Sequence, residues 1–133
     1  MTNFGEFIHR IKAYAGKETI TEKKKPWGKE VIWANNVGEY TAKLLVVDKG
    51  EELSLQYHKR KNETMLILSG QIRLTYGFVK GAENVSILHS GTVIDIPNNT
   101  VHKIKAITTT YIVEVSTYDD GDVVRLQDKY NRK

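Results

Sequence analysis

The chain has no cysteine and only two prolines among its 133 residues. Without cysteine, disulfides and thiolate ligands are excluded, so a metal site must use nitrogen and oxygen donors. No apolar stretch is long enough to span a bilayer, and the first residues lack the features of a secretory signal. We therefore expect a cytoplasmic protein with no membrane partner.

The composition is that of one folded domain with a modest surplus of positive charge. Hydrophobic residues make up 40% of the chain, charged residues 27%, and the formal net charge is +4. These values favour a single globular domain with one core. The surplus charge attracts anions such as sugar phosphates. No aromatic–basic recognition motif accompanies it, so we expect no nucleic-acid partner.

The spacing of apolar residues predicts a short helix followed by strands. Apolar residues recur every three or four positions over 3–15, which indicates an amphipathic helix, and a polar arm follows to residue 25. Beyond it, many short apolar segments separated by glycine-rich turns favour an all-β sandwich or barrel. The candidate strands are 29–34, 40–48, 52–58, 63–69, 71–79, 84–88, 92–96, 102–107 and 109–117. We interpret 1–25 as helix and arm, 26–133 as the β domain, and 122–130 as a short tail helix.

Several candidate strands are apolar on both faces, most clearly at 65–68 and 111–113. A small barrel exposes one face of its strands to water, so an apolar outer face needs a cover. The N-terminal helix, another sheet or a second subunit would supply it. We predict a homodimer, with cover by the helix alone as the alternative.

Four side chains that can hold a metal ion stand at defined spacing among strand-ending glycines and a proline. The first pattern, from residue 50 to 70, is G-x5-Q-x-H-x4-E-x6-G, and the second, from 91 to 102, is G-x5-P-x4-H. Alternate residues of a strand face the same side, so the glutamine and first histidine point together. Two nitrogens and two oxygens fit Zn²⁺, with Mn²⁺, Co²⁺, Fe²⁺ and Ni²⁺ as alternatives. The predicted ligands are Gln56, His58, Glu63 and His102.

At these residues the chain resembles the cupin superfamily, whose motifs are G-x5-H-x-H-x3,4-E-x6-G and G-x5-P-x-G-x2-H-x3-N. Here Gln56 takes the place of the first histidine, Asn99 that of the second-motif glycine and Ala106 that of the final asparagine. The resemblance implies an all-β cupin barrel, also called a double-stranded β-helix or jelly roll, preceded here by a short helix.

More narrowly, residues 25 to 132 resemble the cupin domain of type II phosphomannose isomerases. The matching segments are KPWGKE, EELSLQYH, IPNNTVHKI, YIVEVST and DDGDVVRLQDKYNR. A glutamine in the metal set is itself a trait of that family. The domain is often fused behind a mannose-1-phosphate guanylyltransferase. Because 133 residues leave no room for that second domain, we expect no guanylyltransferase activity.

The resemblance implies a metal-dependent enzyme that interconverts mannose 6-phosphate and fructose 6-phosphate. Arg125, within the signature-like DVVRLQD segment, is the first candidate for a phosphate contact and a catalytic role. Lys61 and Arg60 are further substrate-binding candidates. Lys43 and Glu114 are candidates for the acid–base group. Asp122 and Asp128 are interpreted as tail caps or salt-bridge partners.

One departure from the family pattern leaves other functions open. The family's H-H-R-A-E-H-W run is replaced by K-R-K-N-E-T-M over residues 59–65, which keeps the glutamate but neither the extra histidines nor the aromatic residue. Lysine in place of the arginine preserves charge without the bidentate fork. The alternatives are a cupin epimerase or isomerase for another sugar or sugar nucleotide, and a sugar-binding cupin without catalysis.

Overall fold

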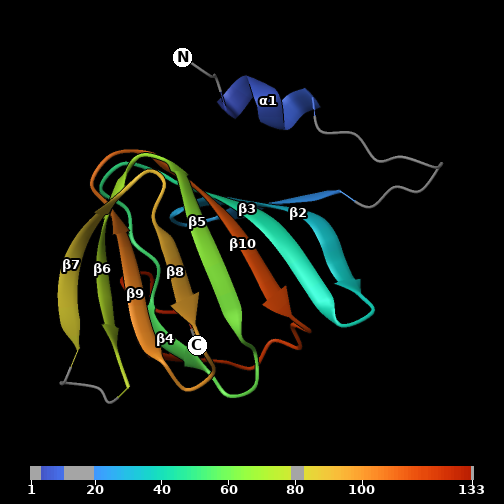
Figure 1. The fold of residues 1–133 in the computed structure, drawn as a ribbon. Coiled ribbons are helices and arrows are strands. Elements are labelled where there is room, and N and C mark those ends of the chain that lie inside the picture. The colour runs from blue at the N-terminus through green and yellow to red at the C-terminus, as the bar shows by residue number, and fades with distance from the viewer. Residues whose placement is uncertain (1–3, 11–19, 79–82, 133) are drawn as a thin grey trace.

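The computed structural model describes residues 4–10, 20–78 and 83–132, and its strands form two facing antiparallel sheets (Figure 1). One short helix, α1, spans Phe4–Arg10. In spatial order, the six-stranded sheet contains β1 (Thr21–Lys25), β2 (Gly28–Val37), β3 (Tyr40–Val47), β10 (Thr110–Thr117), β5 (Glu63–Ser69) and β8 (Val93–Ile96). The five-stranded sheet contains β11 (Val123–Gln127), β4 (Leu55–His58), β9 (Val101–Ala106), β6 (Gln71–Gly77) and β7 (Asn84–His89). The predicted all-β cupin architecture is confirmed.

The main core lies between the two sheets. Because side chains alternate along a strand, each sheet sends every second residue inward. Ile67, Ile72 and Ile112 are fully buried there, with Leu45, Met65 and Ile104 almost so. Complete burial of each such side chain stabilises the fold by about 1.5–3 kcal/mol.

A second apolar cluster explains the strands that are apolar on both faces. Val31, Leu44 and Val46 point to the outer face of the six-stranded sheet and pack with Ile8 of α1. The rings of Phe4 and Tyr111 also meet there, with centroids 5.3 Å apart. The helix therefore covers part of this face. Val93 and Val115, on the same sheet, are 61% and 46% exposed, and the homodimer stays a prediction.

Two segments differ from the sequence-based expectation. Residues 21–25, expected as part of an arm, form β1 and pair with β2, while residues 123–127, expected as helix, form β11 and pair with β4. Tertiary pairing at a sheet edge overrides the local pattern in both cases. The expected helix over 3–15 is found for residues 4–10, and positions 3 and 11–15 lie outside the described residues.

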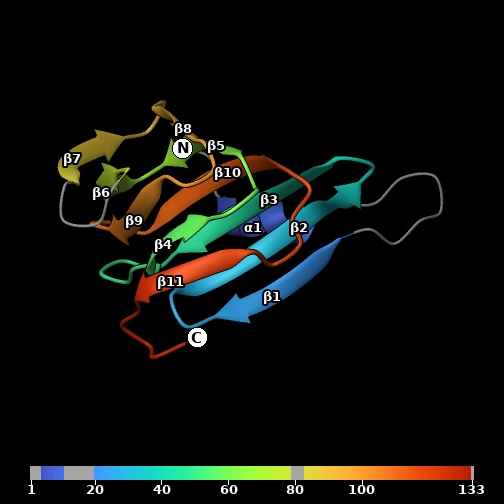
Figure 2. The ribbon, with the colours of Figure 1, turned by 90° about the horizontal axis from the view of Figure 1, so that it is seen from below.

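β1 and β11 are edge strands, one in each sheet, and they border the same end of the barrel (Figure 2). A tight turn at Pro26 and Trp27 connects β1 to β2, whose first residue is Gly28. Trp27 is 3% exposed and its carbonyl accepts a 2.9 Å hydrogen bond from the Asp48 amide. Gly28 has φ +149°, and a Cβ there would clash with the Val46 carbonyl oxygen. Only glycine fits this approach.

α1 is the single helix in the described ranges, and no helix there has the length and apolarity needed to cross a membrane.

Candidate metal centre

Three of the four predicted ligands converge inside the barrel. His58 ends β4, Glu63 begins β5 and His102 lies on β9, and they are 6%, 5% and 2% exposed. Each offers one ligand atom within 4.8 Å of the others. The Nε2 atoms of His58 and His102 lie 3.4 and 3.5 Å from the two Glu63 carboxylate oxygens. Two ligand atoms that share one ion at a tetrahedral angle are about 3.4 Å apart.

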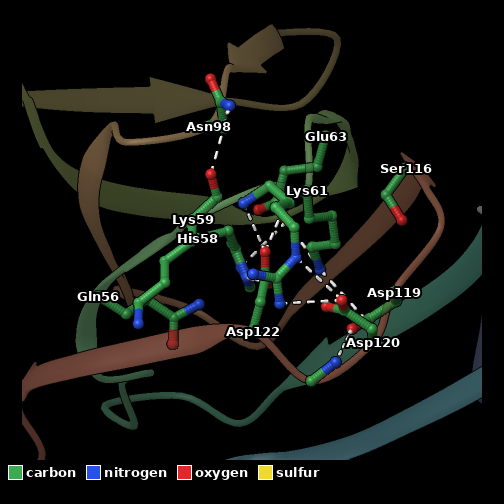
Figure 3. Close-up of polar contacts among 12 residues, drawn as sticks. Gln56, His58, Lys59, Lys61, Glu63, Asn98, Ser116, Asp119, Asp120 and Asp122 are labelled. Carbon is green, nitrogen blue, oxygen red and sulfur yellow. Dashed lines mark hydrogen bonds and ion pairs between the residues drawn. The ribbon is translucent and has the colours of Figure 1, made fainter.

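Hydrogen bonds at the opposite ring nitrogens fix the tautomer of both histidines. His58 Nδ1 lies 3.0 Å from Asp122 Oδ1 (Figure 3). His102 Nδ1 lies 2.9 Å from the Thr100 carbonyl oxygen. Both partners accept hydrogen bonds, so each Nδ1 carries the proton and each Nε2 presents a lone pair. Burial, together with the charge of Lys61, lowers the pKa of His58 and keeps the imidazole neutral.

The residues present fit a divalent metal ion. Both Nε2 atoms are buried and have no hydrogen-bond partner among the described residues. Their lone pairs face carboxylate oxygens, and such electron-rich atoms repel one another unless a cation lies between them. Although burial opposes its ionisation, the charge of Lys61 helps to lower the pKa of Glu63. Imidazoles with a free Nε2 lone pair and an ionised carboxylate are the ligand forms that a metal requires.

Gln56, the fourth predicted ligand, lies beside this cluster. It is paired in register with His102 across β4 and β9, and its side chain lines the same cavity. Its Oε1 atom accepts a 2.6 Å hydrogen bond from Ser54 Oγ, which holds the amide in place and leaves one oxygen lone pair. Coordination by Gln56 stays a prediction.

Asp122, interpreted from the sequence as a tail cap or salt-bridge partner, contacts a candidate metal ligand. Its carboxylate accepts hydrogen bonds from the backbone amides of Arg60 and Lys61, at 2.6 and 3.0 Å, besides its contact with His58 (Figure 3). It thus anchors both the ligand histidine and the turn leading to Glu63. The available signal was the position of Asp122 at the start of the DVVRLQD segment, where the local pattern alone indicates a tail cap.

A buried network of charges adjoins the metal ligands. Lys61 Nζ lies 2.9 Å from Glu63 Oε2 and 3.4 Å from both Glu114 Oε2 and Asp119 Oδ2. Burial opposes the charge of Lys61, yet Glu114, Glu63 and Asp119 raise its pKa well above the usual range. Lys61 donates hydrogen bonds to Glu114 and Asp119 and forms an ion pair with Glu63, so three carboxylates surround its ammonium group.

Lys43 and Asp119 extend this network toward the mouth of the cavity. Lys43 Nζ lies 3.2 Å from Asp119 Oδ2 and 3.6 Å from Glu30 Oε1. Although burial opposes the change, Lys61 and Lys43 lower the pKa of Asp119. Glu114 differs, because burial and the charge of Glu63 raise its pKa to about 7. The network thus contains one carboxyl group that titrates near neutral pH.

A cavity of about 340 Å³ connects these groups with the surface. Among the predicted substrate-binding and catalytic residues, Lys43, Lys61, Glu114 and Arg125 line it. Arg60 is not among the lining residues. Its side chain is 63% exposed and pairs with Asp120, with 2.9 Å between Arg60 Nη2 and the carboxylate. The structure therefore brings together all of these candidates except Arg60.

A protein-family model described as "Mannose-6-phosphate isomerase C-terminal" matches residues 13–128. The chain belongs to this family. It is 26% identical over 136 residues to Mannose-1-phosphate guanylyltransferase 2 of Escherichia coli O157:H7, covering 96% of the chain and 27% of that protein. It is 30% identical over 133 residues to Mannose-1-phosphate guanylyltransferase ManC of Salmonella typhimurium, covering 94% and 26%. The chain thus spans about a quarter of the length of these relatives.

Solved structures agree on the fold. A mutant form of oxalate decarboxylase OxdC from Bacillus subtilis superposes with a TM-score of 0.68 at 21% identity, over 80% of this chain and 30% of that one. At this identity the likeness concerns the cupin barrel alone. The chain is therefore a cupin domain related to the C-terminal part of sugar-phosphate enzymes, and the chemistry of its own site is a separate question.

Proposed function

We propose that the protein is a metal-dependent isomerase that interconverts mannose 6-phosphate and fructose 6-phosphate. The observation that carries this proposal is the meeting, in one cavity, of buried metal-ligand residues and a buried carboxyl group that titrates near neutral pH. Membership of a family described by mannose-6-phosphate isomerase supports the choice of substrate.

His58, Glu63 and His102 would hold the ion, with Gln56 as the proposed fourth ligand. When bound, the ion supplies a Lewis acid that polarises the oxygens of the sugar. Zn²⁺ is the first candidate because the donors are imidazole nitrogens and oxygens. Mn²⁺ is the second, since the structurally similar Bacillus subtilis oxalate decarboxylase contains Mn(II) centres.

Glu114 is the proposed acid–base residue. In the aldose-to-ketose direction its carboxylate takes the proton from C2 and, after a cis-enediol has formed, returns a proton to C1, while a hydroxyl proton passes from O2 to O1. A carboxyl group with a pKa of about 7 is suited to both steps, because its two protonation states are similarly populated at neutral pH. Lys61 contacts Glu114 and holds it in position, and the charges of Lys61 and Lys43 stabilise its anionic form.

Lys61 acts within this scheme as a fixed internal cation. Its contacts with Glu63, Glu114 and Asp119 keep three carboxylates close together and offset part of their negative charge. Because these carboxylates surround its buried ammonium group, we no longer propose Lys61 as a phosphate contact.

The test is a coupled assay for conversion of mannose 6-phosphate, using protein loaded in turn with Zn²⁺, Mn²⁺ and Co²⁺. We expect metal-dependent turnover that is lost in His58→Ala together with the metal. Glu114→Gln should retain the metal but lose about 10²–10⁴ in rate. Val115→Thr is the matched control, because Val115 is the next residue on β10 and points to the outer face.

Absence of mannose 6-phosphate turnover in fully loaded protein would refute the isomerase assignment. Turnover of another sugar or sugar nucleotide would then identify a different cupin enzyme. Saturable sugar binding without turnover of any tested sugar would indicate a binding protein.

A further inference from the structure

The cations that line the cavity differ in how far their charge is already compensated. Lys61 contacts three carboxylates and Lys43 contacts two. Arg132 is held by Asp128, with nitrogen–oxygen distances of 2.8 and 3.0 Å to its two oxygens. The charges of these three residues are therefore matched by carboxylates of the protein.

Lys23 and Lys25 of β1 line the same cavity but have fewer carboxylate partners. They alternate with Lys24 along the strand, so they share the inward face while Lys24 points away. Lys25 Nζ lies 3.8 Å from Glu30 Oε2. The same carboxylate group also forms an ion pair with Lys43. Lys23 forms no ion pair with the part of the chain that the structure describes. The inward face of β1 thus carries positive charge that the protein compensates poorly.

Arg125 faces this strand from the other sheet. It lies on β11, an edge strand of the five-stranded sheet, and lines the same cavity as Lys23 and Lys25. The edges of the two sheets therefore place cationic side chains on opposite sides of one opening. Carboxylates also line the cavity, but its lysines and arginines outnumber them, and a surplus of positive charge in a concave opening attracts anions.

On the basis of the proposed phosphosugar activity, we propose that Lys23, Lys25 and Arg125 form a clamp for the phosphate monoester of the ligand. The phosphate is held at the cavity mouth, and the sugar extends inward toward His58, Glu63 and His102. Two ammonium groups and a guanidinium match the charge and the acceptor oxygens of a phosphate dianion. The clamp takes over the role that sequence reasoning gave to Lys61 and Arg60, and it draws on β1, a segment expected to be an exposed arm.

The test compares Lys23→Gln/Lys25→Gln with Lys24→Gln by calorimetric titration of metal-loaded protein. Lys24 is the matched control, because it lies between the other two on β1 but is absent from the cavity wall. We expect the double variant to bind mannose 6-phosphate about tenfold more weakly than wild type or worse. Lys24→Gln should remain within about twofold of wild type. Unphosphorylated mannose should bind all three proteins equally, and inorganic phosphate should compete with mannose 6-phosphate.

Equal mannose 6-phosphate affinity in wild type and the double variant would overturn the clamp. The same conclusion follows if Lys24→Gln weakens binding as much as the double variant, or if wild type binds neither mannose 6-phosphate nor inorganic phosphate at millimolar concentration. Binding requires no chemistry, so the two proposals fail separately. Phosphate-dependent binding without turnover refutes the isomerase alone, and turnover with unchanged affinity in the double variant refutes the clamp alone. Unchanged metal content and thermal unfolding would show that the variants are folded.

Discussion

The two ends of the barrel interior are built from the same strands but have opposite chemistry. Toward the cavity, the inward positions of β3, β5, β9 and β10 carry charged residues or candidate metal ligands, and a few residues further along they are apolar. The pairs of inward residues are Lys43 and Val47 on β3, Glu63 and Ile67 on β5, His102 and Ile104 on β9, and Glu114 and Ile112 on β10.

This contrast separates the source of stability from the place of chemistry. Burying an ammonium or carboxylate group costs on the order of several kcal/mol per ion unless groups of opposite charge or hydrogen-bond partners surround it. Packing of the apolar end offsets that cost through about 1.5–3 kcal/mol for each fully buried side chain. Because each strand crosses both ends, the apolar end also fixes the positions of the groups in the cavity.

Lys61→Met should have the largest effect on stability, because it removes the central cation of the polar end. Glu63, Glu114 and Asp119 would lose their common partner, and we expect a loss of about 3–5 kcal/mol in the free energy of unfolding. Urea denaturation measures it, with Lys59→Met, at an exposed position two residues earlier, as the control. A loss no larger than that of the control would contradict the assigned network.

The loss in free energy of unfolding caused by Lys61→Met should also depend on pH. The pKa of Glu114 is already raised in the folded protein, to about 7 from 4.5, so its stabilising contribution is full below pH 4.5 and is lost as the pH rises through 7. Without Lys61 the pKa of Glu114 rises further. Denaturation at about pH 8 and about pH 5.5 should therefore show a smaller difference from wild type at the lower pH.

Ile67→Ala tests the contribution of the apolar end of the barrel interior to stability. Ile67 is fully buried on the same strand as Glu63, and its truncation should cost about 2–5 kcal/mol in the free energy of unfolding. Folded protein should still bind metal with wild-type affinity, because the cavity does not reach this residue. Denaturation and metal titration together check this separation. A clear fall in metal affinity would show that the two ends are mechanically coupled.

Asp122→Asn should weaken metal binding by about 10- to 100-fold, because it removes the carboxylate that orients His58. Nitrogen NMR of His58 should report a changed tautomer balance, which loss of general stability would not produce. Asp120→Asn, two residues earlier and in a surface ion pair, is the control. Retained metal affinity together with an unchanged tautomer would rule out the positioning role of Asp122.

The smallest effect is expected for Arg60→Gln. The exposed pair with Asp120 contributes at most about 1 kcal/mol to folding. Because Arg60 lies outside the cavity wall, mannose 6-phosphate affinity should match that of wild type by calorimetry. A weakened affinity would return Arg60 to the set of substrate contacts.

The apolar strands and the ligand spacing could be predicted from sequence because each leaves a local pattern. The strand predicted over 63–69 has the same bounds in the structure, and Asn99, in the place of the motif glycine, adopts φ +61° as that place requires. β1 could not be found in this way. Its inward lysines line an opening rather than the core, so Thr21–Lys25 shows no alternation of apolar and polar residues.

β11 and Asp122 were missed for a different reason. The segment Val123–Gln127 has no strong local preference, and its pairing with β4 is decided by residues more than sixty positions earlier. The contact between Asp122 and His58 likewise spans 64 positions. Long-range contacts of this kind leave no mark in the local spacing on which sequence reasoning depends.

That long-range contact also has a consequence for biosynthesis. A ribosome releases His58, Glu63 and His102 well before Asp122, so the nascent chain holds its ligand side chains while the carboxylate that orients one of them is still missing. Domains fold largely as units as they emerge during translation. We therefore expect the proposed metal centre to reach high affinity only after the C-terminal strand has docked.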